Sequence, residues 1–235
     1  MKNLFAAILI IISSAAGSAQ NKKAFDNYRV KVDNSILKVF DLNGKQIFSK
    51  KFNDPRSFNS DLDGDGINEV IVEDTFNKGL NTYYTLYIYN CIDTFGPADS
   101  VASGLTAPYI TNSEDIGGPV IVAGNPKFDY LNKDTADIFV PINCWKYENG
   151  ELFNVNDEVY NLFIGENEDI IDFIDSYFES EGKSCGSSNS VKAAIASVYV
   201  NYINAGEKIL AEHFIEKYYL CPDLSGFKKI IEALL

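Results

Sequence analysis

The chain has 235 residues, of which 46% are hydrophobic and 13% are aromatic. This composition provides enough apolar surface for a packed core and excludes an intrinsically disordered protein. The formal net charge of −13 repels phosphate backbones, so a nucleic acid is not an expected partner.

The first 19 residues have the pattern of a secretory signal peptide. Lys2 precedes an apolar run from Leu4 to Ile12, and small residues follow up to Ala19, just before Gln20. The run is shorter than the about 20 residues that a membrane-spanning helix requires. A buried N-terminal helix is the alternative. We therefore expect an exported protein, periplasmic or extracellular, with no membrane span after cleavage.

Residues 20–155 have the periodicity and turn chemistry of an antiparallel β domain. Alternating or β-branched runs predict strands at 28–32, 36–40, 46–48, 69–73, 82–89, 120–122 and 136–140. Turns are expected at Asp33-Asn34 and at Asn43-Gly44. Residues 96–118 are rich in Gly, Ser, Pro and Thr, so we expect a long loop there.

Residues 156–235 change to helical periodicity. Apolar residues recur on one face in 170–178, 191–202, 209–218 and 224–235, which predicts four amphipathic helices. Ser190 is the expected N-cap of the second helix. The helices form either a small bundle or a lid on the β domain. Ten acidic and no basic residues between 151 and 181 indicate a solvated acidic helix face.

Four cysteines follow the signal peptide, and an even number in an exported chain favours disulfides. Four cysteines allow three pairings, among which the sequence does not choose. We prefer Cys185–Cys221 and Cys91–Cys144, because each pair then stays within one of the two regions.

The loop Asp61–Glu69 is the most informative segment. It reads DLDGDGINE, so carboxylates at positions 1, 3, 5 and 9 repel one another unless a cation lies between them. Ca²⁺ prefers six to eight oxygen ligands in a flexible shell, and Gly66 permits the turn that such a loop needs. A metal-free turn and a catalytic metal are the alternatives that we weigh against a structural Ca²⁺. The expected ligands are the side chains of Asp61, Asp63 and Asp65, the main-chain carbonyl of Ile67, and Glu69 directly or through water.

The sequence DLDGDGINEVIV at 61–72 resembles the calcium-binding FG-GAP or VCBS-type repeats of integrin-like β-propellers. These repeats usually have Asp where Glu69 stands. A second unit at 129–140 aligns at an offset of 68 residues, but Lys133 replaces the counterpart of Asp65, so no ion is expected there.

The resemblance covers about half of the mature chain and implies antiparallel blades with one loop held by Ca²⁺. A propeller needs at least about four blades, whereas this chain has two such units. The resemblance therefore implies a partial propeller or a small sheet assembly, followed by the helical region 156–235 that covers its open edge.

Three other groups of residues are weaker candidates for a site. The G-x-S-x-G match at 182–186 follows a predicted helix, whereas a nucleophile elbow needs a preceding strand. His213, the sole histidine, is expected to be structural. Trp145, Tyr147 and the tyrosines at 83, 84, 87 and 89 suit either a sugar-stacking platform or sheet packing, and we favour packing.

These observations favour an exported, calcium-binding and non-catalytic binding or adhesion module whose ligand is a protein or a glycan. No catalytic residue is predicted. The alternatives are a secreted hydrolase with an unrecognised carboxylate pair and an inhibitor or accessory subunit whose acidic helices bind a basic partner.

Overall fold

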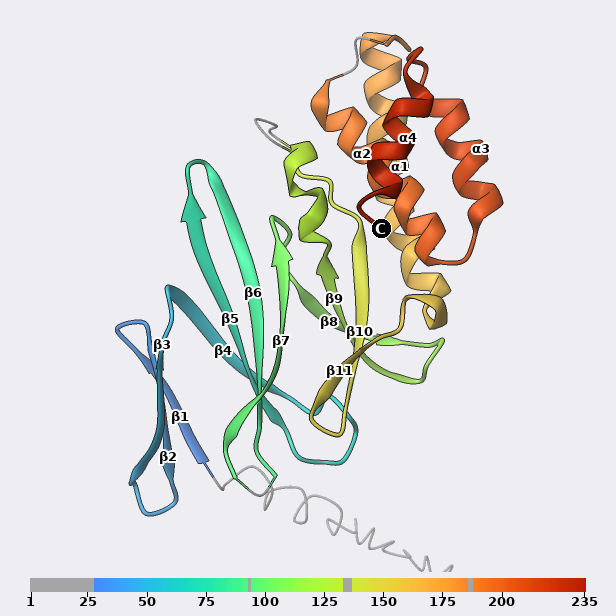
Figure 1. The fold of residues 1–235 in the computed structure, drawn as a ribbon. Coiled ribbons are helices and arrows are strands. Elements are labelled where there is room, and N and C mark those ends of the chain that lie inside the picture. Colours follow the sequence, from blue (N-terminus) through green and yellow to red (C-terminus); the bar gives the residue numbers. More distant parts are fainter. Residues whose placement is uncertain (1–27, 93, 133–136, 186–187) are drawn as a thin grey trace, which may run out of the picture.

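The computed structural model describes residues 28–235 apart from 93, 133–136 and 186–187. Over these residues, three antiparallel sheets precede four helices, and the sheets do not close into a barrel (Figure 1). The predicted order of a mainly β region and a helical region is confirmed. The predicted signal peptide and Lys133 lie outside the described residues.

Sheets 1 and 2 are meanders, in which consecutive strands pair through turns. The β1–β2 turn has positive φ at Asn34 (48°) and Ser35 (61°), as a tight hairpin requires. Sheet 1 contains β1 (Tyr28–Asp33), β2 (Ile36–Asp41) and β3 (Gln46–Lys51). Sheet 2 contains β4 (Asp54–Ser60), β5 (Glu69–Lys78), β6 (Asn81–Asn90) and β7 (Gly96–Gly104).

Sheet 3 has the strand order β11-β10-β9-β8, and the 3-10 helix η1 (Pro126–Asn132) connects β9 to β10. Its strands are β8 (Tyr109–Ser113), β9 (Gly118–Gly124), β10 (Ile142–Glu148) and β11 (Glu151–Asn154). The predicted long loop at 96–118 is therefore wrong, because β7 and β8 occupy most of it. Proline is tolerated in β7 because β7 is an edge strand, and one side of an edge strand has no partner strand that would need its N–H groups.

The predicted strand at 136–140 is also wrong for the residues described there, 137–140. The Phe139 N–H donates to Oδ1 of Asn132 at 2.7 Å, and Nδ2 of Asn132 donates to the Phe139 carbonyl at 2.8 Å. The side-chain amide of Asn132 thus satisfies the main-chain groups that a neighbouring strand would have paired.

All four predicted helices are present, and the short 3-10 helix η2 (Asn156–Glu158) precedes them. They are α1 (Tyr160–Glu181), α2 (Asn189–Asn204), α3 (Lys208–Tyr218) and α4 (Leu224–Glu232). The N-cap of α2 is Ser188, whose Oγ accepts from the Val191 N–H at 3.3 Å, and not Ser190, which is buried in the first turn.

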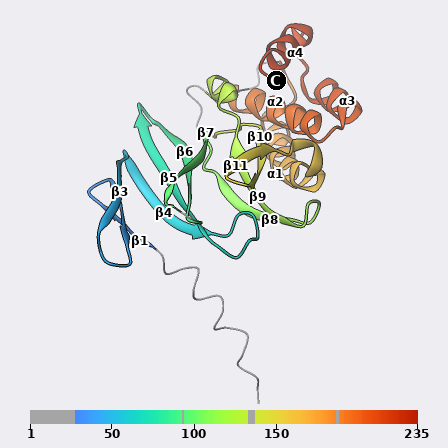
Figure 2. The same ribbon diagram turned by 60° about the horizontal axis from the view of Figure 1, so that its bottom comes forward.

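The helices pack both on one another and on sheet 3 (Figure 2). Phe163 of α1, for example, lies in a buried cluster with Val122 and Ile142 of sheet 3. The opposite side of α1 exposes Glu168, Asp169, Asp172 and Glu179, as the acidic composition predicts. In the described part of the chain, no helix combines the length and the apolar content needed to cross a bilayer.

The core is layered, with one buried cluster between sheets 1 and 2 and another between sheets 2 and 3. Strand β5 is therefore buried on both faces: Val70 and Val72 point into the first cluster, and Ile71 points into the second.

The Cys185–Cys221 disulfide is confirmed, whereas the expected Cys91–Cys144 bond is wrong because both of these cysteines are free and buried. Cys91 lies in the cluster between sheets 1 and 2. Cys144 lies between sheet 3 and α1, on the face of sheet 3 that points away from sheet 2. Layers of the core therefore separate the two thiols.

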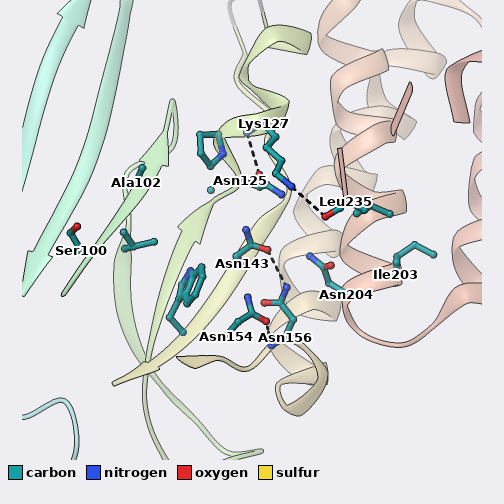
Figure 3. A pocket seen from close by; sticks show the side chains of 14 residues that line it. Ser100, Ala102, Asn125, Lys127, Asn143, Asn154, Asn156, Ile203, Asn204 and Leu235 are labelled. Carbon is teal, nitrogen blue, oxygen red and sulfur yellow. Dashed lines mark hydrogen bonds between the residues drawn. The ribbon is translucent and has the colours of Figure 1, made fainter. Parts of the chain in front are cut away.

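A cleft of about 650 Å³ lies where sheets 2 and 3 meet the helical region (Figure 3). It is bounded by β7, the β9–η1 connection, β10, the β11–η2 junction and the end of α2.

Candidate metal site

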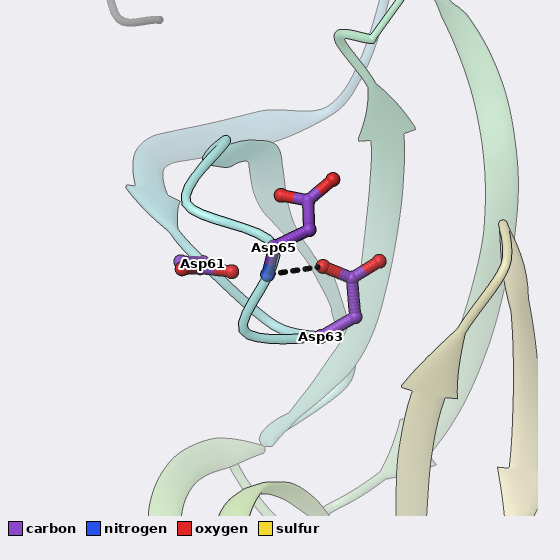
Figure 4. A group of neighbouring side chains, drawn as sticks. All are labelled: Asp61, Asp63 and Asp65. Carbon is purple, nitrogen blue, oxygen red and sulfur yellow. Dashed lines mark hydrogen bonds between the residues drawn. The ribbon is translucent and has the colours of Figure 1, made fainter. Parts of the chain in front are cut away.

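The connection between β4 and β5 brings together three of the predicted ligands. Oxygen atoms of Asp61, Asp63 and Asp65 all lie within 4.8 Å of one another (Figure 4). Positive φ values at Gly64 (77°) and Gly66 (86°) provide the sharp turns that fold the loop in this way.

Main-chain N–H groups hold the carboxylates in place. The two oxygens of Asp61 accept from the N–H groups of Gly64 and Gly66, at 2.8 and 3.0 Å. Asp63 accepts from the Asp65 N–H at 3.2 Å. These bonds order the loop but leave the negative charges close together.

In the described part of the chain, basic side chains do not neutralise this charge. Among the described residues, no lysine, arginine or histidine forms an ion pair with the three aspartates. Burial raises the pKa of Asp63, and the negative charges of Asp65 and Asp61 raise it further. A cation bound between the carboxylates would offset this repulsion.

Glu69, the first residue of β5, has a buried carboxylate beside the loop. Its side chain is fully buried, and Oε2 accepts from the Leu62 N–H at 3.0 Å. Oε1 is buried and has no hydrogen-bond partner among the described residues. Burial, together with the charges of Asp63 and Asp65, raises the pKa of Glu69 to about 7. Such an oxygen is costly unless a ligand satisfies it.

Two of the predicted ligands are not in the group of three. Glu69 does not belong to the set of carboxylates within 4.8 Å. The Ile67 N–H donates to Oδ1 of Asp65 at 2.6 Å, and the Ile67 side chain packs on the core between sheets 1 and 2. Coordination by Glu69 and by the Ile67 carbonyl therefore stays a prediction.

Tyr147 of β10 is a neighbour of the site that the sequence analysis treated as a packing residue. Its hydroxyl is buried without a hydrogen-bond partner among the described residues. Burial, followed by the nearby charges of Glu69 and Asp63, raises its pKa well above the usual range. Tyr147 and Leu62 share the core cluster between sheets 2 and 3, so the loop is anchored to both sheets. Because the two segments are remote in sequence, no local pattern reveals this pairing.

The second repeat-like unit is placed differently from the first. The Asp61 loop joins the first two strands of sheet 2, whereas Asp129 lies in η1 between the second and third strands of sheet 3. Asp129 accepts from the Leu105 N–H at 3.2 Å, and burial raises its pKa to about 6.

The G-x-S-x-G match and His213 gain no support as functional sites from the described residues. Ser184 follows helix α1, and its neighbour Cys185 is part of the disulfide. Gly186, the last residue of the G-x-S-x-G match, lies outside the described residues. His213 is exposed on α3. Tyr89 and Tyr147 are buried, in agreement with their predicted packing role.

Comparison of the chain with protein-family models, with curated proteins and with solved structures finds no match.

Proposed function

We propose that this protein is an exported, non-catalytic binding module in which a structural Ca²⁺ ion fixes the loop between β4 and β5. The proposal rests on the proximity of Asp61, Asp63 and Asp65 to one another. It rests equally on the buried Oε1 of Glu69 beside them, which has no hydrogen-bond partner among the described residues. The cation would remove the repulsion among the aspartates and give the Glu69 oxygen a partner, directly or through a bridging water.

Oxygen ligands favour a hard cation. Ca²⁺ accepts six to eight oxygens in a flexible arrangement, whereas Mg²⁺ demands near-ideal octahedral geometry. Three carboxylates on a nine-residue loop, completed by the Ile67 carbonyl, Glu69 and water, suit the less demanding ion. The resemblance to FG-GAP or VCBS-type loops supports the same choice.

Export is supported by two independent features. The N-terminal 19 residues have the signal-peptide pattern, and the Cys185–Cys221 disulfide is typical of an oxidising compartment. Extracellular calcium modules bind Ca²⁺ with dissociation constants of about 10⁻⁴–10⁻³ M, so a weak site is filled outside the cell.

The cleft supports a binding role over a catalytic one. None of the described residues that line it is an aspartate, glutamate, histidine or cysteine, the usual sources of general acid–base or nucleophilic catalysis. We assign the ion a structural role, because the loop that it would hold is packed into the core. Leu62, which lies between Asp61 and Asp63, is 2% exposed in the core between sheets 2 and 3.

Isothermal titration calorimetry of metal-stripped protein with CaCl₂ tests the proposal. We expect one Ca²⁺ per chain, much weaker binding of Mg²⁺, and loss of the binding heat in Asp63→Ala. Asp172→Ala, on the exposed side of α1, is the matched control and retains wild-type binding. Absence of binding in the wild type, or equal binding by Asp63→Ala and Asp172→Ala, would overturn it.

A further inference from the structure

The cleft between sheets 2 and 3 has an uneven composition. Five of its lining residues are asparagines, at 125, 143, 154, 156 and 204, and one is Trp145. None of the described lining residues is acidic, although the chain has 33 aspartates and glutamates. A surface rich in side-chain amides, and without acidic side chains among its described residues, favours neutral hydrogen bonding.

One face of sheet 3 forms the floor of the cleft. Asn143 and Trp145 are two residues apart on β10, so their side chains project from the same face. Asn154 of β11 is directly opposite Trp145 in the antiparallel register. Directly opposed residues lie on the same face of a sheet, so the indole has an amide on either side.

The main chain fixes the orientation of the Asn156 amide, which in turn fixes that of Asn143. Oδ1 of Asn156 accepts from the Cys144 N–H at 2.8 Å, so its Nδ2 faces the other way and donates to Oδ1 of Asn143 at 3.1 Å (Figure 3). Asn143 is thereby left with its Nδ2, a donor with no partner among the described residues.

The same reasoning applies to the other asparagines. Asn154 and Asn125 use Oδ1 to accept from the N–H groups of Asn156 and Lys127, each at 3.2 Å, which leaves two further Nδ2 donors. Asn204 uses Nδ2 to donate to the Ile142 carbonyl at 3.0 Å, which leaves its Oδ1 as an acceptor. The cleft therefore offers three oriented donors and one oriented acceptor.

The cleft has little charge to offer an ion. Lys127, the one cationic side chain among the described lining residues, donates to the main-chain oxygen of Leu235 at 3.3 Å. The net charge of −13 disfavours an anionic ligand. A cationic ligand would find no acidic side chain among the described lining residues.

We propose that this cleft is a binding site for a neutral carbohydrate. A sugar hydroxyl both accepts and donates hydrogen bonds, so it matches the Nδ2 groups of Asn125, Asn143 and Asn154 and the Oδ1 of Asn204. The half-buried Trp145 provides an apolar ring face for the C–H face of a pyranose. Its Nε1 is buried and has no hydrogen-bond partner among the described residues.

This inference rests on the proposed role as a binding module and names its ligand class, but it does not depend on the ion. Trp145 is the single tryptophan of the chain, so its signals report on this site alone. The experiment is a titration of the full protein with neutral sugars: glucose, galactose, mannose, N-acetylglucosamine, maltose, cellobiose and lactose. Indole fluorescence and the indole N–H resonance of Trp145 are recorded, and sodium phosphate and citrate form an anionic arm.

We expect at least one of the sugars to shift both signals saturably. Asn154→Ala, which alters an exposed residue, is expected to weaken that sugar about three- to tenfold, the loss typical of one hydrogen bond. Asn43→Ala, at an exposed turn of sheet 1, is the matched control and leaves the affinity unchanged.

Three outcomes would overturn the inference: no sugar shifts the Trp145 signals, an anion alone shifts them, or Asn154→Ala and Asn43→Ala bind equally well. Calcium calorimetry on the same protein separates the two proposals. A normal calcium response without sugar binding overturns the carbohydrate site alone, whereas sugar binding without a calcium response overturns the metal site alone.

Discussion

The replacement Asp129→Asn is expected to change how stability depends on pH. Burial raises the pKa of Asp129 from 3.8 to about 6, although the carboxylate accepts the Leu105 N–H. Between pH 3.8 and about 6, the native state therefore keeps the Asp129 carboxyl protonated, whereas the unfolded state has released that proton. It follows that stability is fully present below pH 3.8 and decreases as the pH rises to 6.

The magnitude follows from the size of the shift. Each pKa unit corresponds to about 1.4 kcal/mol of unfolding free energy. Because Asp129 is partly exposed, solvent screening reduces this free energy, and we expect a loss of about 1–2 kcal/mol at high pH. Asparagine keeps an acceptor for the Leu105 N–H and carries no charge. Asp129→Asn should then be more stable than wild type by this amount at pH 7.5 and equally stable at pH 3.5.

Urea unfolding of both proteins between pH 3.5 and 7.5 measures the difference. Asp172→Asn is the matched control, because it removes one negative charge from the exposed side of α1. Identical pH profiles for wild type and Asp129→Asn, or a variant less stable than wild type at pH 7.5, would refute the reasoning.

Three further predictions concern the core and the cysteines. Replacing Cys185 and Cys221 together by serine should lower the free energy of unfolding in urea by about 3–4 kcal/mol, since their bond spans 36 residues of sequence; an unchanged value would contradict a stabilising role. Denatured, unreduced protein should expose two thiols to a thiol reagent, Cys91 and Cys144, and native protein none; zero or four thiols after denaturation would disprove the pairing. Leu62→Ala should cost about 2–5 kcal/mol in the same urea assay, because Leu62 is 2% exposed between two sheets; a loss below about 1 kcal/mol would show that the loop is not anchored there.

The sequence predicts the helical region well because each helix carries its own amphipathic period. The acidic residues of α1, such as Asp169 and Asp172, lie on the exposed side that the pattern indicates. The main error in this region concerns the N-cap of α2. Ser188 and Ser190 are both chemically suited to that position, and the point at which the helix begins decides which Oγ accepts a main-chain N–H.

The strands missed by the sequence analysis are those whose pairing is decided by neighbours. Strand β7 begins with Gly96 and Pro97, which have low β propensity, but it pairs along the aromatic strand β6. Conversely, Ile138, Phe139 and their neighbours have β propensity but find the amide of Asn132 in place of a partner strand.

The residues of the candidate sites also differ in whether the sequence predicts their proximity. Asp61, Asp63 and Asp65 are close in sequence, so their meeting is predictable from the loop. Tyr147 reaches the same loop from another sheet, and the asparagines of the cleft come from four separate segments. No local pattern encodes contacts of that kind.

Thermal unfolding in millimolar Ca²⁺ and in chelator is the most direct test of the claim that an ion holds the β4–β5 loop in place. A ligand that binds only the native state adds about 1.4 kcal/mol at ten times its dissociation constant and about 2.7 kcal/mol at a hundred times. We predict a higher melting temperature in Ca²⁺ for wild type and Asp172→Ala, and no such gain for Asp63→Ala. Equal melting of all three proteins in both conditions would contradict the account.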